Sequence, residues 1–479
     1  MGKNAYILRL FLLLTIWVAT TTLSAQRDSS LLDYDLNLRS TVGLGKQAPF
    51  LSTANQWDRF SFTPNSLALW GTVHKHLKEH SAFDYGFGAE FDANISPTET
   101  RIFPGELYVD AKAGPFVFTA GGKQAIYGNQ DPLLSSGGML WSRNARPMPR
   151  LSLESFGYIP VPFTHRFVEV KGGITHGWFI DSTVTKHTLL HYKYAGIRLG
   201  GTLPVHLNYT LHHVAQWAGT SPQYGTSPAT FANFLRVLMG KSGDESAPAT
   251  ERYNTLGNHI ISKNLGLEFS FKNVNLEVYW QNIYEDKPIH YMYKAYNYED
   301  GLWGLSLHMP KNKLLDHLLL EYLSTTDMSG PWHDLDGLIY GGSDNYYNNG
   351  VYPNGWSFYG MTLGNPWLTS PKYNANYENG AVSFFNNKVR VYHVAGTGHV
   401  GPLDYTGVFA YALNYGTMHP LSVTTICKKQ YSWMLNTEMP CPYINQTRLT
   451  MGFSGDLGKQ YGNNYALLLG LRWEGRLAW

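Results

Sequence analysis

The chain has 479 residues, a formal net charge of +2 and a mean hydropathy of −0.25. It lacks the basic runs of a nucleic-acid-binding protein and the strong hydropathy of a bundle of membrane helices. Only 15% of its residues are charged, against roughly 25% in an average globular domain, and another 15% are aromatic, which is typical of outer-membrane β-barrels.

The first 25 residues have the pattern of a secretory signal peptide. Two basic residues precede an apolar segment from Leu10 to Val18, and Leu23-Ser24-Ala25 is a suitable cleavage site. The apolar segment is shorter than the roughly 20 residues that a membrane-spanning helix needs. We therefore expect export after removal of residues 1–25, which leaves a periplasmic protein, a secreted protein or an outer-membrane barrel. The low charge and high aromatic content favour the last, a single outer-membrane β-barrel domain over residues 26–479.

Apolar and polar residues alternate repeatedly along the rest of the chain. Successive side chains of a strand point to opposite faces, so each alternating segment has one apolar face and one polar face. A charge facing lipid at mid-bilayer would cost on the order of 2–4 kcal/mol. The polar face of each strand must therefore point into the lumen. The clearest strands are predicted at residues 83–93, 107–113, 205–212, 265–271 and 276–281. We predict an all-β, antiparallel transmembrane barrel of roughly 16–18 strands.

Prolines mark an irregular stretch from Asp131 to Pro162, because proline cannot donate to the ladder of a central strand. We interpret this stretch as a plug or structured loop. Its arginines, which we expect to gather and to pair with acidic side chains of the lumen, are Arg143, Arg146 and Arg150.

A helical insertion is predicted at about residues 227–240. Ser227 suits the N-cap and Pro228 the first turn, apolar residues follow at helical spacing, and Gly240 can end the helix. Such a helix lies outside the bilayer or inside the lumen, because it cannot replace a wall strand.

No motif in the sequence indicates an enzyme site, a cofactor or a metal. Residues 396–401 match G-x-G-x-x-G, but no helix follows, so we interpret them as a turn between strands. His74, His76 and His80 lack a further type of ligand nearby.

Cys427 and Cys441 are the two cysteines of the sequence. Export permits a disulfide, and the segment between the two residues reads as a loop that such a bond would staple. Two free thiols are the alternative.

The last predicted strand, from Tyr465 to Trp479, alternates most regularly. One face is apolar and aromatic, as the lipid-facing side of a barrel requires, and the aromatic end is typical of strands recognised by the barrel assembly machinery. The other face carries Arg472, Glu474 and Arg476. We predict that these three residues are buried in ion pairs inside the barrel, against the plug.

Short motifs spread in order along most of the chain carry a family resemblance. They are Ser135–Gly138, Asn144–Pro149, Pro160–His165, Gly172–Trp178, His191–Tyr194, Gly257–His259, Asp344–Tyr352, Gly355–Trp356 and Gly364–Pro366. Together they resemble the Wzi-type capsule assembly family, in the form found in Bacteroidetes-type bacteria.

The resemblance implies a barrel of about eighteen strands, with a few short periplasmic or plug helices and an extracellular face closed by loops. It implies a lectin-like monomer that contacts outer-membrane lipid, binds exported capsular polysaccharide and helps to hold it at the cell surface, without catalysis. The alternative is an outer-membrane porin, which shares the barrel but has an open lumen.

The segment from residue 341 to 356 offers chemistry that suits a sugar chain. Tyrosine and tryptophan rings have apolar faces with a polar tip, and asparagine and aspartate pair with hydroxyls. The same residue types are common in ordinary loops, and Trp332, His333, Asp334 and Asp336 are equally ambiguous. The candidate polysaccharide-binding residues are Asp344, Asn345, Tyr346, Tyr347, Asn348, Tyr352 and Trp356.

Overall fold

The structure is a computed structural model. It describes residues 31–181, 184–253, 255–285, 298–309, 314–328, 333–335, 338–340, 344–417 and 426–478. The predicted signal peptide, Trp332 and Asp336 lie outside these residues. Within them, no helix is long and apolar enough to cross a membrane.

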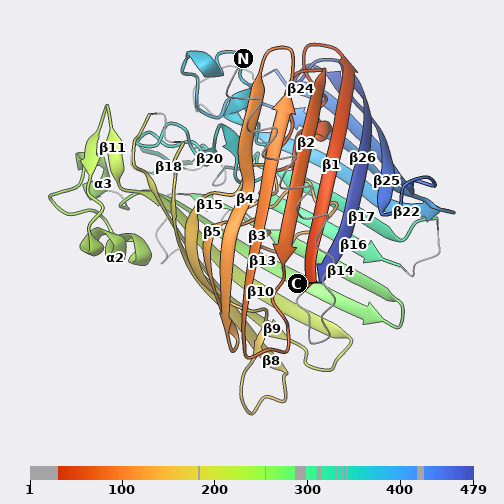
Figure 1. Ribbon diagram of the computed structural model, residues 1–479. Helices are drawn as coiled ribbons and strands as arrows, with labels where there is room; N and C mark the ends of the chain where they lie inside the picture. Colours follow the sequence, from red (N-terminus) through yellow and green to blue (C-terminus); the bar gives the residue numbers. More distant parts are fainter. Residues whose placement is uncertain are drawn as a thin grey trace, which may run out of the picture.

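The described strands close into one antiparallel barrel, as the alternation predicted (Figure 1). A twenty-stranded sheet contains two two-residue segments, β7 (Ile159–Pro160) and β15 (Tyr284–Glu285), and eighteen longer wall strands. The wall strands are β1 (Leu31–Leu44), β2 (Ser66–Lys75), β3 (Phe83–Ile95), β4 (Thr100–Ala113), β5 (Phe116–Gly122), β6 (Arg150–Ser155), β8 (Val168–Trp178), β9 (Leu189–Leu199), β10 (Val205–Trp217), β13 (Asn258–Phe271), β14 (Val274–Gln281), β16 (Gly301–His308), β17 (His317–Ser324), β22 (Val389–Val400), β23 (Leu403–Asn414), β24 (Lys428–Pro440), β25 (Thr447–Gly458) and β26 (Asn464–Ala478).

Pairing of β26 with β1 closes the ring, from Leu31 opposite Ala478 to Leu44 opposite Tyr465. The alternation predicted for this strand is confirmed. Apolar side chains on one face are exposed, where lipid surrounds a barrel, whereas Leu468 on the other face is buried. The exposed residues of this face are Tyr465, Leu467, Leu469, Leu471 and Trp473.

The two ends of the barrel differ in the length of their connections. Residues 114–115, 272–273 and 401–402 form tight turns at one end, which we call the short-turn end, whereas residues 45–65 and 123–149 connect strands at the long-loop end. Barrels of the outer membrane place short turns in the periplasm and long loops outside the cell. The long-loop end is therefore the extracellular end.

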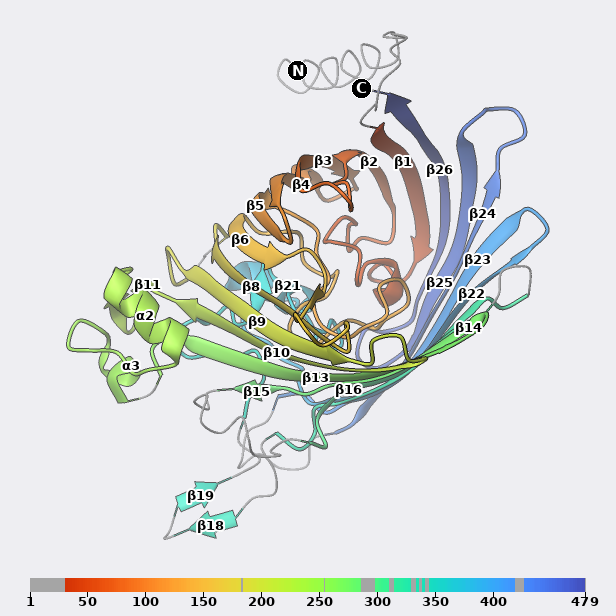
Figure 2. The ribbon, with the colours of Figure 1, turned by 90° about the horizontal axis from the view of Figure 1, so that it is seen from below.

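Three long loops fold back into the lumen and form a plug, which we define as residues 45–65, 123–149 and 344–388. Figure 2 shows this chain inside the ring of strands. The plug contains η1 (Phe50–Ser52), β20 (Ser357–Phe358), β21 (Met361–Thr362), η3 (Pro371–Tyr373) and η4 (Tyr377–Asn379). The predicted plug at 131–162 extended too far, because residues 150–155 are wall strand β6. The prediction also missed the plug segments 45–65 and 344–388.

Helices occur at the long-loop end, between β10 and β13, and project beside the barrel (Figures 1 and 2). α2 (Phe231–Met239) begins after Thr230, whose hydroxyl accepts the N–H of Asn233, and ends at the left-handed Gly240. The predicted Ser227 cap is therefore wrong. Ser227 instead ends β12 (Gly225–Ser227), which pairs with β11 (Gly219–Ser221).

The short periplasmic or plug helices that the resemblance implied lie in the plug, as η1, η3 and η4, and the described residues of the periplasmic connections contain none. α3 (Ala249–Tyr253) lies in the same extracellular connection as α2. A further hairpin, β18 (His333–Leu335) and β19 (Leu338–Tyr340), extends from the connection between β17 and β22.

The predicted disulfide between Cys427 and Cys441 is wrong. Both cysteines are free, and they flank the thirteen-residue strand β24, so they lie at opposite ends of the barrel wall. A disulfide needs Cα atoms within about 7 Å, whereas a strand of this length spans about 40 Å.

Leu471 lies mid-strand on the lipid-facing side, whereas Leu44 lies at the extracellular end of β1. We expect Leu471→Arg to lower the free energy of unfolding by about 2–4 kcal/mol and Leu44→Arg by at most about 1 kcal/mol, because the cost of a charge depends on depth in the bilayer. Denaturant unfolding from lipid vesicles measures both. Equal costs at the two positions would contradict the assigned membrane belt.

Candidate functional site

A buried carboxylate, Asp58, joins all three segments of the plug. Arg146 Nε lies 3.0 Å from Asp58 Oδ2, and Lys372 Nζ lies 3.6 Å from Oδ1. Arg101 of β4 adds a bond to the wall, with Nη1 3.2 Å from Oδ1. Burial by itself would raise the pKa of Asp58, but the charges of Lys372, Arg146 and Arg101 outweigh this effect and hold the pKa below its usual value. Asp58 is therefore ionised at neutral pH.

Further polar contacts attach the plug to the wall. Arg59 pairs with Asp92 of β3 at 3.0 Å and also contacts Glu90 of that strand. On the other side of the lumen, Glu321 of β17 accepts the Ser135 hydroxyl at 2.7 Å and the Ser136 N–H at 2.6 Å. The plug is therefore attached to opposite sides of the wall, and these contacts supply the hydrogen-bond partners that buried polar groups need.

The plug also has an apolar core of its own. The rings of Phe50 and Trp367 lie 4.5 Å apart, and those of Trp141 and Trp356 lie 5.5 Å apart. These residues belong to one buried cluster that extends to the lumen side of the wall. The lumen is thus packed with side chains from distant parts of the sequence.

The four aromatic residues that the sequence indicated as polysaccharide-binding belong to this core. Tyr346, Tyr347, Tyr352 and Trp356 are at most 2% exposed. The Tyr346 hydroxyl donates to Asp300 at 2.9 Å, and the Trp356 indole donates to the Leu140 carbonyl at 2.8 Å. A side chain without accessible surface cannot contact a polysaccharide, so this part of the prediction is wrong.

The polar residues of the same loop are different. Asn345 is exposed, and Asp344 and Asn348 are partly exposed. Asn345 Oδ1 accepts amide hydrogens from Asn387 at 2.6 Å and from Asn348 at 3.0 Å. Their role in sugar binding stays a prediction.

Sequence reasoning missed a second polar and aromatic surface on the plug, which we call the outer face. It comprises Tyr359, Asn376, Tyr377 and Asn379, in the connection at the long-loop end. Tyr359 is 38% exposed, and Asn376 and Asn379 are exposed. The run of asparagine and tyrosine from residue 373 to 379 was the available signal.

Charged groups support Tyr359 from beneath. The Arg146 guanidinium lies 4.4 Å from the centre of its ring, and a carboxylate oxygen of Asp181 accepts its backbone N–H. Burial raises the pKa of Asp181 to about 6, although the hydrogen bond and Arg146 act in the opposite direction. The outer face thus presents an aromatic ring in a fixed position beside amide groups.

The three predicted plug arginines do not form one cluster. Arg146 reaches Asp58, whereas Arg143 donates to the carbonyl of Leu133 at 2.7 Å. Arg150 lies on β6 and donates to the carbonyl of Lys123 at 3.0 Å. Only Arg146 has the predicted ion pair, and its acidic partner belongs to the plug, not to the wall.

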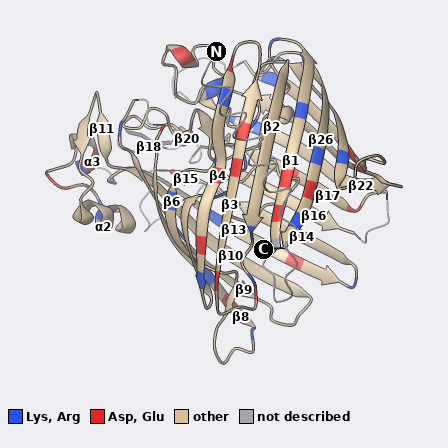
Figure 3. Cartoon of the chain, in the orientation of Figure 1, with Lys and Arg blue, Asp and Glu red and all other residues tan. Residues whose placement is uncertain are grey.

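Arg472, Glu474 and Arg476 form ion pairs, but not with the plug. Arg472 Nε lies 2.7 Å from Asp35, and Arg476 Nε lies 2.9 Å from Asp33, both on the adjacent strand β1. The side chains are 35%, 44% and 71% exposed, so the predicted burial is wrong. These pairs lie near the short-turn end, where neighbouring strands carry opposite charges (Figure 3).

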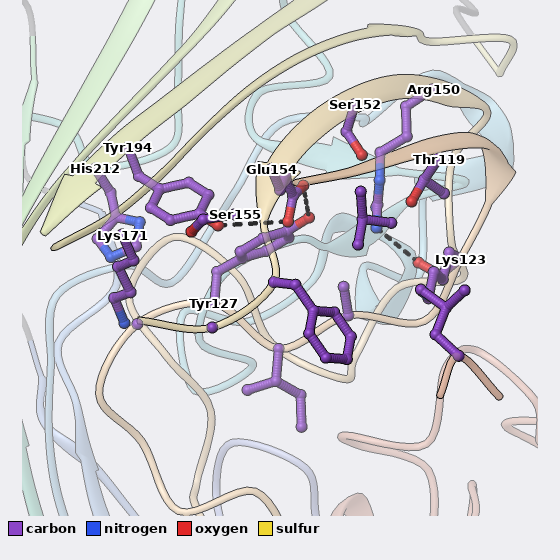
Figure 4. A pocket seen from close by; sticks show the side chains of 17 residues that line it. Thr119, Lys123, Tyr127, Arg150, Ser152, Glu154, Ser155, Lys171, Tyr194 and His212 are labelled. Carbon is purple, nitrogen blue, oxygen red and sulfur yellow. Dashed lines mark hydrogen bonds between the residues drawn. The ribbon is translucent and has the colours of Figure 1, made fainter. Parts of the chain in front are cut away.

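A cavity of about 300 Å³ lies between the plug and the short-turn end. In Figure 4, the Tyr127 hydroxyl donates to Glu154 at 2.8 Å and the Tyr194 hydroxyl donates to the same carboxylate at 3.4 Å. Lys171 and His212 line the same cavity. Tyrosine rings beside a carboxylate and a lysine suit a polar ligand such as a sugar.

A second cavity, of about 620 Å³, lies across the lumen. Trp367 and Tyr405 provide aromatic surface, and Asn55, Asn436 and Asp316 provide polar groups. Both cavities face the periplasmic end, and the plug lies between them and the outer face.

Comparison with known families identifies the chain. The profile of the family named capsule assembly protein Wzi matches residues 53–391, which include most of the plug. The chain belongs to this family. No curated protein matches the chain.

The solved structure of a Wzi protein has the same fold. The chain is similar to Wzi of Escherichia coli, described as a carbohydrate-binding β-barrel of the outer membrane involved in group 1 capsule assembly. The identity is 12% over 92% of this chain and 84% of that protein, with a TM-score of 0.58. OccK5 (OpdH) of Pseudomonas aeruginosa is less similar, with 9% identity over 95% of this chain and 100% of that protein and a TM-score of 0.47. This chain is an outer-membrane β-barrel of the Wzi family.

Removal of the Asp58 carboxylate is expected to loosen the whole plug. Asp58→Ala leaves buried cations without a counter-charge, so we expect a loss of about 3–5 kcal/mol in the free energy of unfolding. Asp244→Ala is the matched control, since Asp244 lies 3.4 Å from Arg236 at an exposed site, where an ion pair contributes little to stability. Denaturant titration compares them. A small loss at Asp58 would contradict its role.

Proposed function

We propose that this protein binds exported capsular polysaccharide at the cell surface and helps to hold it there as a layer, by binding and without catalysis. Membership of the capsule assembly family supports this function. The observation that carries the proposal is the plug, whose packed core and Asp58 ion pairs occupy the lumen. A porin needs an open lumen, so the presence of the plug disfavours the porin alternative.

We place the polysaccharide contact on the outer face. It lies at the long-loop end, where an assembled capsule meets the cell, whereas both cavities face the periplasm. The Tyr359 ring offers an apolar face for a sugar, and the amides of Asn376 and Asn379 offer donors and acceptors for hydroxyls. Asp344, Asn345 and Asn348 extend the same polar surface in this proposal.

A plugged barrel should conduct ions poorly. In planar bilayers we expect no large, stable open-channel steps from the whole protein, whereas a variant with residues 123–149 replaced by a short turn should conduct. That variant is the control for insertion into the bilayer. Large steps from the whole protein would favour the porin.

Variants of the outer face test the binding site. We expect Tyr359→Ala and Asn376→Ala each to weaken binding of purified capsular polysaccharide about five- to tenfold, equivalent to about 1–1.4 kcal/mol. Tyr443→Ala is the matched control, because Tyr443 is 92% exposed in a turn at the periplasmic end. Biolayer interferometry with the folded barrel gives the affinities. Unchanged affinity in both outer-face variants would show that the polysaccharide binds elsewhere on the protein.

The role in the cell is tested by deletion of the gene. Polysaccharide synthesis should continue while polymer is shed into the medium, because the proposed step is retention. Cell-bound and released polymer are quantified separately. An unchanged amount of cell-bound capsule would contradict the proposed function.

A further inference from the structure

Three potential metal ligands meet where the plug touches the wall near the short-turn end. They are Asp131 of the plug, His308 at the end of β16 and His317 at the start of β17. One ligand atom from each lies within 4.8 Å of the others. This site is separate from the outer face and does not depend on the proposed function.

Both imidazoles present the same atom to the same point. Asp131 Oδ2 lies 2.6 Å from His317 Nε2 and 3.9 Å from His308 Nε2. The two rings stack at 3.8 Å because the residues are directly opposite each other in the β16–β17 pair. In a tetrahedral zinc site with bonds of about 2.0–2.1 Å, ligand atoms lie about 3.3 Å apart, which falls between the two observed distances.

The carboxylate is held in the orientation that a metal needs. Asp131 Oδ1 accepts the N–H groups of Leu133 and Leu134 at 3.0 and 2.9 Å, so Oδ2 is left to face the histidines. The Ser306 hydroxyl donates to Oδ2 at 2.8 Å. Such hydrogen bonds to a metal-ligating carboxylate orient it and increase metal affinity.

Access and ligand chemistry indicate the type of ion. Asp131 and His317 are buried, whereas the side chain of His308 is 49% exposed and leaves a path from the lumen. Two imidazole nitrogens and one carboxylate oxygen suit zinc and similar transition metals, whereas calcium and magnesium prefer oxygen ligands alone.

We propose that Asp131, His308 and His317 bind one divalent transition-metal ion of the zinc type, with water as the fourth ligand. The ion connects residues 123–149 of the plug to strands β16 and β17. It thereby fixes the plug at its periplasmic side, opposite to the attachment that Asp58 provides.

Equilibrium dialysis of the metal-stripped, folded barrel against Zn²⁺ tests the proposal. We expect one bound ion per barrel, visible d–d absorption with Co²⁺ in its place, and a higher melting temperature with Zn²⁺. His308→Ala, at the half-exposed position, and His317→Ala should each weaken binding at least about tenfold. His187→Asn, at an exposed histidine with a φ of 61°, is the control and should bind normally.

Two results would overturn the proposal. One is the absence of saturable Zn²⁺ binding by the folded barrel, which would leave Asp131 and His317 as a simple hydrogen-bonded pair. The other is binding that persists unchanged in both His308→Ala and His317→Ala. Because His308→Ala removes a partly exposed side chain, a loss of binding in this variant would not reflect failure to fold, and circular dichroism checks this directly.

Discussion

The ion pairs of Asp58 are the interaction on which the interior of this protein depends. A carboxylate without solvent contact is costly to bury unless cations compensate it, and here Arg101, Arg146 and Lys372 do so. Each of the three plug segments supplies at least one of these groups, and the fourth group comes from the wall. The ion pairs therefore form completely only when the three loops are folded together, and the same arrangement brings Phe50 and Trp367 into contact in the apolar core.

The plug that these ion pairs hold together separates the extracellular end of the barrel from the periplasmic end. The exterior faces lipid with apolar side chains, the interior holds the Asp58 ion pairs, and the plug divides the outer face from the two periplasmic cavities. A barrel built in this way is suited to present a rigid surface outside the cell. Within the Wzi family, this arrangement is consistent with retention of a polymer and inconsistent with diffusion of solutes through the lumen.

The wall could be predicted from the sequence because alternation is a local signal. Leu467, Leu469 and Leu471 indicate a lipid-facing strand without knowledge of any other strand. The same signal was present at Tyr431, Trp433 and Leu435 of β24, a segment that was instead predicted to be a loop. The plug could not be assembled in this way, since Asp58 and Arg146 are 88 residues apart and their pairing depends on how the loops return. For the same reason, Tyr346 and Trp356 resembled surface residues, although the loop that carries them turns inward.

Hydrogen exchange of backbone amides in the folded barrel, followed by mass spectrometry, tests the central claim most directly. If Asp58 unites the plug, peptides from residues 45–65, 123–149 and 344–388 should be protected as strongly as peptides from the wall strands. In Asp58→Ala, all three should lose protection together, because they share one set of ion pairs. Rapid exchange of the three segments in the unmodified protein, or loss of protection in only one of them in the variant, would contradict the account.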